Sequence, residues 1–382
     1  MRTLGAYVHV PFCATRCGYC DFNTYTAQEL QRDGTTVSTA TYVDRVISEV
    51  TRQRTALGNN SQPLTSVFFG GGTPTLLGST ELVRALTSLK KEFGLLANAE
   101  ITTEVNPDSV NAHDLEILRE GGFTRVSFGH QSSAPKVLQL LERTHTPGRT
   151  WEAVNWANEA GFEHISVDLI YGSPNETQAE LELTLSEVIA ADIDHVSAYS
   201  LIVEPGTKLA AQVARGEVNA PSDDVAASRY ELIDQQLSSA GFEWYEVSNW
   251  AKPGGECKHN LNYWHNQDWI GIGPGAHAHI NGLRTWMIKH PAAWAAQVDQ
   301  NEEPIDGSEV LSATEIANEN IMLGLRLRDG IELATLSPAG IEQANEAVTQ
   351  GLLYSDLFTL GRVVLTPKGR LLADGLVSRL WN

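Results

Sequence analysis

The feature that most constrains the fold is an alternation of short β-rich runs with amphipathic helical stretches. The stretches between the runs carry apolar residues at helical spacing, as in 79–93, 112–122 and 178–191. Such alternation is typical of parallel α/β units, in which each helix crosses over one face of a sheet. We expect six parallel strands, at 6–10, 66–70, 100–106, 125–131, 164–172 and 195–203. The sequence therefore predicts an α/β fold, a partial (β/α)6 barrel within residues 1–240.

Two further regions follow the predicted barrel. Residues 241–305 contain six of the nine tryptophans, which predicts an aromatic-rich extension; the six are Trp244, Trp250, Trp264, Trp269, Trp286 and Trp294. In residues 306–382 the expected order is helix, helix, β-like pair and helix, at 314–327, 341–350, 357–369 and 369–381. That order resembles a small winged-helix domain.

The charge of the chain bears on its partners. The chain has 27 Lys and Arg against 47 Asp and Glu, a formal net charge of -20, which repels phosphate backbones. The last predicted helix offers few basic residues to a DNA groove, so we expect no nucleic-acid partner. No run approaches the roughly 20 apolar residues of a spanning helix. We therefore expect a cytoplasmic protein without a transmembrane segment, and peripheral contact with a membrane is left open.

Three of the four cysteines lie within eight positions, in Cys13-Ala-Thr-Arg-Cys17-Gly-Tyr-Cys20. Four cysteines in a chain this long cannot form a disulfide framework, so their clustering indicates a metal site in a reducing compartment. A structural zinc site usually has four protein ligands, whereas a cubane held by three thiolates keeps one iron open. From these residues alone, two alternatives stay open: three buried cysteines on one helix face, and a zinc site completed by a distant His.

The CxxxCxxC spacing beside the aromatic Tyr19 resembles the signature of the radical S-adenosylmethionine (SAM) superfamily. The resemblance implies a 4Fe-4S cluster on Cys13, Cys17 and Cys20. It also implies that the amino and carboxylate groups of SAM chelate the open iron, and that an electron from the cluster cleaves SAM to a 5′-deoxyadenosyl radical.

Polar and glycine residues stand at the ends of successive predicted strands, where parallel barrels place their ligand-contacting residues. One strand runs into Gly70-Gly71-Gly72-Thr73-Pro74, where missing side chains would let backbone amides approach a ligand. The whole pattern resembles the coproporphyrinogen-dehydrogenase-like branch of the superfamily. By that resemblance the SAM contacts are Tyr7, Tyr19, Gly71, Gly72, Thr73, Glu104, Gln131, Arg143, Asp168 and Ile202. As residues alone, Glu104 and Arg143 also fit salt bridges at the barrel rim, and Tyr7 and Ile202 fit ordinary core positions.

Two functions compete within this branch: oxidative decarboxylation of coproporphyrinogen III, and delivery of haem to client proteins. The dehydrogenase group carries CxxxCxxCxC, whereas Asp21 and Phe22 follow Cys20 here. The run from His259 to Trp264, HNLNYW, resembles the HNxxYW motif of the haem chaperone group, HemW. By that resemblance His259 binds haem, and an imidazole is a good axial ligand.

Several readings around this motif stay open. Taken alone, a His among aromatic residues also fits a hydrogen-bonded core histidine. Cys257 as a second haem ligand is an open alternative, and no ligand role is assigned to His277 or His279 in the glycine-rich run GIGPGAHAH.

The resemblance thus predicts a haem chaperone with a SAM-binding 4Fe-4S cluster and without coproporphyrinogen oxidase activity. Its predicted partners are haem and client haemoproteins, a homodimer is left open, and no catalytic residue is assigned. The alternative is an oxygen-independent coproporphyrinogen III oxidase, a radical SAM oxidative decarboxylase.

Overall fold

One sheet of 12 strands dominates the protein, in a computed structural model that describes residues 2–32, 37–58 and 62–381. The strand order is β14-β13-β12-β11-β1-β4-β5-β6-β7-β8-β10-β9. Its middle confirms the six predicted strands, which are β1 (Leu4–Val10), β4 (Leu64–Gly71), β5 (Leu95–Val105), β6 (Arg125–Gln131), β7 (His164–Tyr171) and β8 (His195–Ser200). Each is parallel to its neighbours in this group, so all six carboxyl ends lie at one edge.

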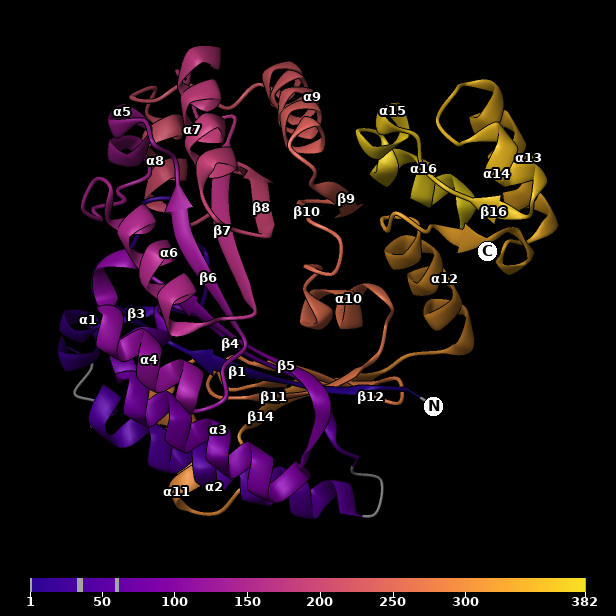
Figure 1. The fold of residues 1–382 in the computed structure, drawn as a ribbon. Coiled ribbons are helices and arrows are strands. Elements are labelled where there is room, and N and C mark those ends of the chain that lie inside the picture. The colour runs from indigo at the N-terminus through magenta and orange to yellow at the C-terminus, as the bar shows by residue number, and fades with distance from the viewer. Residues whose placement is uncertain (1, 33–36, 59–61, 382) are drawn as a thin grey trace.

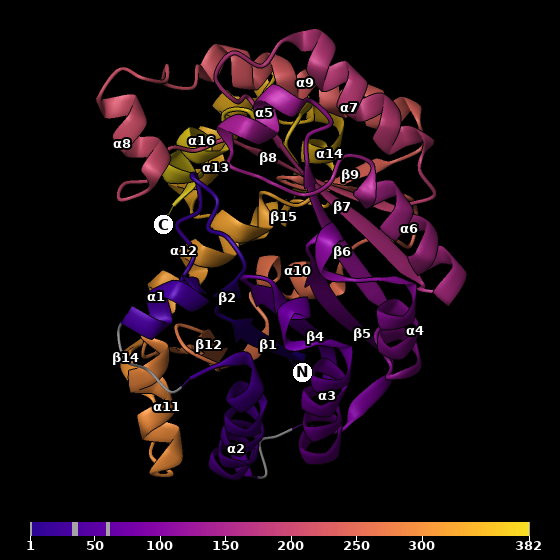
Figure 2. The ribbon, with the colours of Figure 1, turned by 90° about the vertical axis from the view of Figure 1, so that its left-hand side faces the viewer.

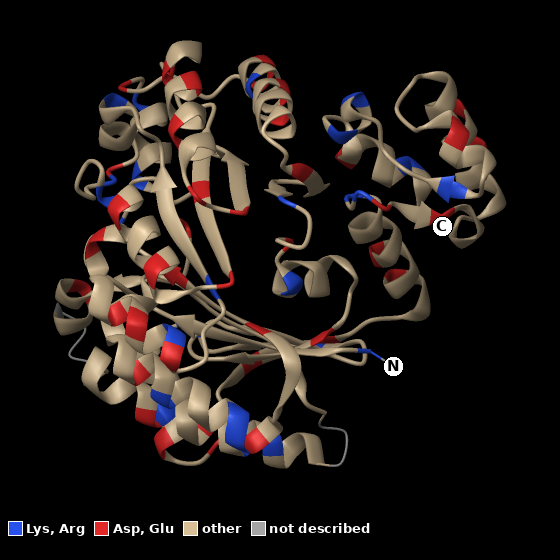
Figure 3. Ribbon diagram, in the orientation of Figure 1, with Lys and Arg blue, Asp and Glu red and all other residues tan. Residues whose placement is uncertain are grey.

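Helices cover the outer face of these strands and make the partial barrel visible in Figures 1 and 2. They are α2 (Thr39–Leu57), α3 (Ser79–Phe93), α4 (Ala112–Glu120), α6 (Arg149–Ala160), α7 (Gln178–Ala190) and α9 (Asp223–Ser239). Their apolar faces pack on the sheet; α3 buries Leu82, Leu86 and Leu89. Acidic and basic residues mix on the outer surfaces of α2, α3 and α4 (Figure 3), where Arg84 pairs with both Asp44 and Glu81.

Start signals in the sequence set several helix boundaries. The Thr177 hydroxyl accepts from the Glu180 amide, and the Glu180 carboxylate accepts from the Thr177 amide in return. This reciprocal pair satisfies two of the N–H groups that the first turn of α7 leaves without helical partners. Asn111 and Asp114 do the same for α4.

The aromatic-rich extension is part of the sheet, which the sequence did not predict. The strand β11 (Asp268–Ile272) runs parallel to β1, with Ala6 opposite Ile270. Antiparallel strands continue that edge, namely β12 (His277–Ile280), β13 (Leu283–Met287) and β14 (Ile305–Val310). The far edge holds β10 (Asn249–Ala251) and β9 (Glu243–Glu246), and the helices α10 (Lys258–Trp264) and α11 (Pro291–Asp299) complete the segment.

The C-terminal segment has a hydrophobic core of its own, which includes Ile321, Leu336, Ala344 and Leu376. Its elements are α12 (Ala313–Gly324), β15 (Ile331–Glu332), α13 (Pro338–Thr349), α14 (Ser355–Thr359), β16 (Arg362–Val363), α15 (Pro367–Arg370) and α16 (Ala373–Leu380). The predicted β-like pair at 357–369 is wrong. Residues 355–359 are helical, Gly361 then turns the chain with φ 82°, and β16 pairs with β15 instead.

The remaining elements are short. Those of the barrel region are β2 (Phe12–Cys13), β3 (Tyr25–Thr26), α1 (Ala27–Arg32), α5 (Pro135–Leu140), α8 (Lys208–Ala214) and the 3-10 turns Pro74–Leu77 and Pro107–Ser109. A further 3-10 turn, Leu333–Thr335, belongs to the C-terminal segment. Among the helices described, none is long and apolar enough to cross a membrane. The domain boundaries near residues 240 and 305 stay predictions.

Candidate functional site

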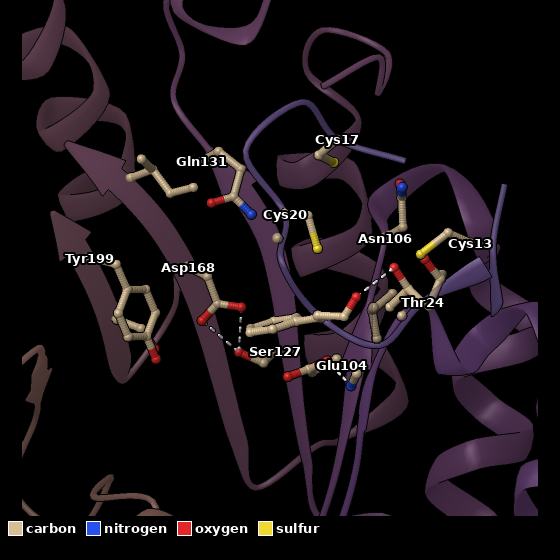
Figure 4. A pocket seen from close by; sticks show the side chains of 18 of the residues that line it. Cys13, Cys17, Cys20, Thr24, Glu104, Asn106, Ser127, Gln131, Asp168 and Tyr199 are labelled. Carbon is tan, nitrogen blue, oxygen red and sulfur yellow. Dashed lines mark hydrogen bonds between the residues drawn. The ribbon is translucent and has the colours of Figure 1, made fainter. Parts of the chain in front are cut away.

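A cavity of about 580 Å³ opens at the carboxyl ends of the six parallel strands and reaches down to α10. Its volume lies within the range typical of small-molecule sites. Every residue that the sequence singled out as a ligand contact lines it: Tyr7, Cys13, Cys17, Tyr19, Cys20, Gly71, Gly72, Thr73, Glu104, Gln131, Arg143, Asp168, Ile202 and His259. Figure 4 shows Cys13 and Asn106 on one side of the cavity and Asp168 and Tyr199 on the opposite side.

The three thiols come from one loop, residues 13–24, that we call the cysteine loop. Burial raises the pKa of Cys13 to about 11 and raises the pKa of Cys20 as well. Neutral thiols of this kind become ligands when a metal displaces their protons. No three Cys, His, Asp or Glu side chains converge at metal-binding distances within the described ranges. The donor set of three soft ligands on one loop nevertheless fits an iron–sulfur cluster.

Asn23 anchors the far end of the cysteine loop. Its side-chain amide donates to two carbonyl oxygens on the extension, Pro274 O at 3.0 Å and Lys289 O at 2.8 Å. Its own backbone carbonyl accepts from His9 Nε2 at 2.9 Å, and its Oδ1 accepts from the Tyr25 hydroxyl at 3.2 Å. The loop is therefore tied to β1 and to a segment some 250 residues away in sequence.

The glycine-rich run noted in the sequence forms the other side of this anchor. Gly273 has φ 97°, and a Cβ there would lie 2.6 Å from His9 O. Gly275 has φ 76°, and its Cβ would lie 2.6 Å from Asn23 Nδ2. Both positions need glycine because of the backbone conformation and the close approach. The Gly273 amide donates to the buried Glu49 carboxylate at 2.9 Å, which fixes the run against α2.

The amides of residues 71–73 have acceptors within the protein, and their contact with a ligand stays a prediction. All three donate within the protein: Gly71 to Glu104 Oε2 at 3.0 Å, Gly72 to Val10 O at 2.8 Å and Thr73 to Phe12 O at 2.7 Å. The glycines are instead required by packing, since a Cβ on Gly72 would lie 2.4 Å from Phe12 O. These residues still line the cavity wall.

Two carboxyl groups face the middle of the cavity. Burial, together with the charge of Asp168, raises the pKa of Glu104 to about 8, and burial raises the pKa of Asp168 to about 6. Asp168 accepts from the Ser127 hydroxyl at 3.0 Å (Figure 4). Arg143 donates to Gly129 O at 2.8 Å and lies 3.8 Å from Cys17 Sγ, so one cation connects the cysteine loop to β6. A cationic ligand would offset the cost of ionising both carboxyl groups.

His259 lies at the opposite end of the cavity, on α10, and its side chain is fully enclosed. It is 1% exposed, it stacks on Phe68 with ring centroids 5.3 Å apart, and burial lowers its pKa to about 3. Both ring nitrogens have partners, Ser66 Oγ at 2.8 Å for Nδ1 and Tyr263 OH at 2.8 Å for Nε2. The imidazole is thus neutral, the form that binds metal ions, but its Nε2 is already engaged.

The neighbours of His259 divide into cavity and non-cavity residues. Cys257 also lines the cavity, and its thiol donates to Glu100 Oε1 at 3.3 Å, while burial raises its pKa. His277 and His279 belong to β12 and are absent from the residues that line the cavity.

Sequence reasoning missed a row of polar residues deeper in the barrel. Thr102, Arg125, Ser166 and His195 all line the cavity, each two positions before another polar residue of its strand that also lines it. A polar residue at i and i+2 on four successive strands was the signal, because alternate residues of a strand share a face.

Comparisons with known proteins identify the family of this chain. Residues 7–188 match the model of the radical SAM superfamily. A protein from Mycobacterium tuberculosis named heme chaperone HemW is 46% identical over 99% of this chain and 95% of its own length. Its namesake from Bacillus subtilis is 32% identical, over 97% of each chain.

A solved structure shares the fold over the whole chain. It is coproporphyrinogen III oxidase (HemN) from Escherichia coli, with a TM-score of 0.83 at 22% identity, covering 100% of this chain and 90% of that one. At this identity the likeness concerns the fold alone. The full-length sequence matches are what decide the family, and they show that this chain belongs to the HemW family of the radical SAM superfamily.

Proposed function

We propose that this protein is a haem chaperone, which binds haem, transfers it to client haemoproteins and carries a SAM-binding 4Fe-4S cluster. The observation that carries the proposal is the full-length match to heme chaperone HemW, in a chain whose HNLNYW motif and cysteine loop border one cavity. Family membership supplies the expectation, and the shared cavity supports a link between the two cofactor sites.

Cys13, Cys17 and Cys20 would hold the cluster, which supplies an open iron corner for SAM and single electrons when bound. Glu104 and Asp168 suit the positively charged SAM, because ionising both carboxyl groups beside a cation is less costly than ionising them alone. Tyr19 packs with the small apolar cluster around Leu141 and Leu209, and so presents an aromatic ring at the cavity wall for adenine.

Haem has two candidate contacts in this cavity. Large apolar side chains are exposed at its mouth, with Phe22 58% exposed, Ile202 65% and Tyr199 45%, and they suit the face of a macrocycle. His259 is the candidate iron ligand from the motif. It requires that Nε2 leave the Tyr263 hydroxyl, while Ser66 continues to hold Nδ1.

The alternative, a coproporphyrinogen III oxidase, has less support. Its group carries a fourth cysteine where this chain has Phe22, an exposed side chain at the cavity mouth. The likeness to HemN is one of fold.

Anaerobic reconstitution followed by two assays tests the proposal. Haem titration should give a saturable spectral change, and the loaded protein should reconstitute an apo-haemoprotein client. Coproporphyrinogen III should not be decarboxylated; steady protoporphyrinogen formation would overturn the chaperone function.

A second set of haem titrations tests the ligand role of His259. It compares His259→Ala with the control His277→Ala, because His277 does not line the cavity. If His259 ligates the iron, only His259→Ala changes the haem spectrum. An unchanged spectrum would reject the ligand role and leave the chaperone function standing.

A further inference from the structure

The inner wall of the barrel carries two levels of polar side chains. The upper level consists of Glu104, Ser127, Asp168 and Ser197, on β5, β6, β7 and β8. The lower level, which we call the lower ring, consists of Thr102, Arg125, Ser166 and His195, each two residues earlier on the same strand. Thr102 is opposite Arg125, and Ser166 is opposite His195, in the strand register. The family resemblance assigns ligands to the upper level and none to the lower ring.

Polar atoms of the lower ring are buried without protein partners. Thr102 is 0% exposed and His195 is 2% exposed. Neither Thr102 Oγ1 nor His195 Nδ1 has a hydrogen-bond partner among the residues that the structure describes. Burying an unsatisfied polar atom destabilises a protein, so such atoms call for an explanation. Here both residues line the cavity.

The unpartnered polar atoms of the lower ring can act as hydrogen-bond donors. Burial, together with the charge of Arg125, lowers the pKa of His195 well below its usual value, so its imidazole is neutral and carries one N–H. The Tyr245 hydroxyl accepts from the Cys257 amide at 3.3 Å and lies 2.7 Å from His195 Nε2. If that hydroxyl donates its hydrogen bond to Nε2, the N–H of the neutral imidazole is on Nδ1, the unpartnered nitrogen.

Arg125 and Ser166 add two further donors. The guanidinium has five N–H groups, and it contacts Glu100 Oε2 at 3.0 Å, Ser166 Oγ at 3.2 Å, Gly255 O at 2.8 Å and Glu256 O at 3.3 Å. One N–H on Nη1 is left over. Ser166 Oγ accepts from Arg125, so its own proton is free to donate. Four donors therefore line the cavity on four adjacent strands.

The carboxylate of Glu100 does not compete for this position. Its oxygens accept from Arg125 Nε, from the Cys257 thiol and from the His259 amide at 3.2 Å, and Glu100 is not among the residues that line the cavity. Glu100 thus balances the positive charge of Arg125 from outside the cavity. A group with several acceptor oxygens satisfies this arrangement best.

We propose that the lower ring is a subsite for a carboxylate group of the molecule that occupies the cavity. The assignment rests on the proposed function, in which haem enters the mouth and supplies the carboxylate through a propionate. The lower ring then accounts for the orientation of haem, because only a haem with a propionate pointing inward supplies hydrogen-bond acceptors to Thr102 and His195.

The test compares haem with haem dimethyl ester, whose propionates are blocked, on the full-length reconstituted protein in one mild detergent. We expect haem to bind at least about tenfold more tightly than the ester, the effect of one or two hydrogen bonds to a charged group. Thr102→Val has the same shape but no hydroxyl, and it should weaken haem binding about tenfold while leaving ester binding unchanged. Thr103→Val is the matched control, since Thr103 is buried on the other face of β5 and does not line the cavity.

Each outcome decides between proposals. Equal affinity of the wild-type protein for haem and its ester overturns the subsite and leaves haem binding intact. An unchanged ratio of the two affinities in Thr102→Val, and in the second variant His195→Phe, also overturns it. Binding of neither compound rejects the proposed function itself. Thermal stabilisation by sodium propionate alone, with no discrimination against the ester, would assign the lower ring to a small acid and reject the haem propionate.

Discussion

Replacement of Asn23 should release the cysteine loop from the extension. The Asn23→Ala variant loses two hydrogen bonds from Nδ2, at 3.0 and 2.8 Å, and the acceptor of the Tyr25 hydroxyl. Each such bond contributes about 0.5–1.5 kcal/mol net, so the two amide bonds amount to about 1–3 kcal/mol. The loss falls on the loop that carries the thiols, so the metal site should loosen before the barrel does.

The isosteric variant Asn23→Asp sharpens the prediction. It keeps the acceptor for Tyr25 but replaces the donor Nδ2 by a carboxylate oxygen, which then faces the carbonyl oxygens of Pro274 and Lys289. Two donors are lost and a repulsive contact is gained, so Asn23→Asp should be worse than Asn23→Ala. A side chain that only fills space would give the opposite order, because Asp has the shape of Asn.

The assay is the rate of iron loss to a chelator after anaerobic reconstitution, measured beside urea unfolding of the metal-free protein. Asn158→Ala is the matched control, since Asn158 Nδ2 also donates to two carbonyls, Val154 O at 3.1 Å and Asp192 O at 2.9 Å, on the far side of the barrel. Both alanine variants should lose similar stability, and only Asn23→Ala should release iron faster, by about tenfold. Iron release at the same rate in the two variants would refute the anchoring role.

Two further predictions concern buried charges. In the folded protein the pKa of Glu104 is about 8, above its value in the unfolded chain. The cofactor-free protein should therefore lose up to about 1.4 kcal/mol of stability per pH unit as the pH rises from 5 to 8. In chemical unfolding, stability should depend less on pH for Glu104→Gln than for the wild-type protein, and an identical pH dependence would contradict the assigned pKa. Arg125→Met leaves the buried Glu100 carboxylate without its cation, 3.0 Å away, and should lower the free energy of unfolding by about 3–5 kcal/mol in urea titrations; a loss below about 1 kcal/mol would contradict the stabilising role of this ion pair.

The sequence predicted the parts of this protein that depend on local spacing. The six barrel strands follow from apolar runs separated by amphipathic helices. The three cysteines and the residues singled out at strand ends line one cavity, since parallel strands bring their carboxyl ends to one edge.

The C-terminal region and the extension were less predictable. The run 357–369 is too short to distinguish a helical turn from a hairpin, and the strand partner of β16, Ile331–Glu332, lies outside it. Likewise, nothing near Asp268–Ile272 reveals that this run pairs with β1, because the pairing depends on Ala6 and Ile270, more than 260 residues apart.

Only the tertiary structure decided what the side chains of the site do. Both ring nitrogens of His259 are hydrogen-bonded, to Ser66 and Tyr263, and the amides of residues 71–73 donate within the protein. Thr102 and His195 keep unpartnered atoms at the cavity wall. Periodicity fixes the face of a strand on which a residue lies. Whether its polar atoms are satisfied depends on partners that the fold brings in from distant segments, and that information is absent from local sequence.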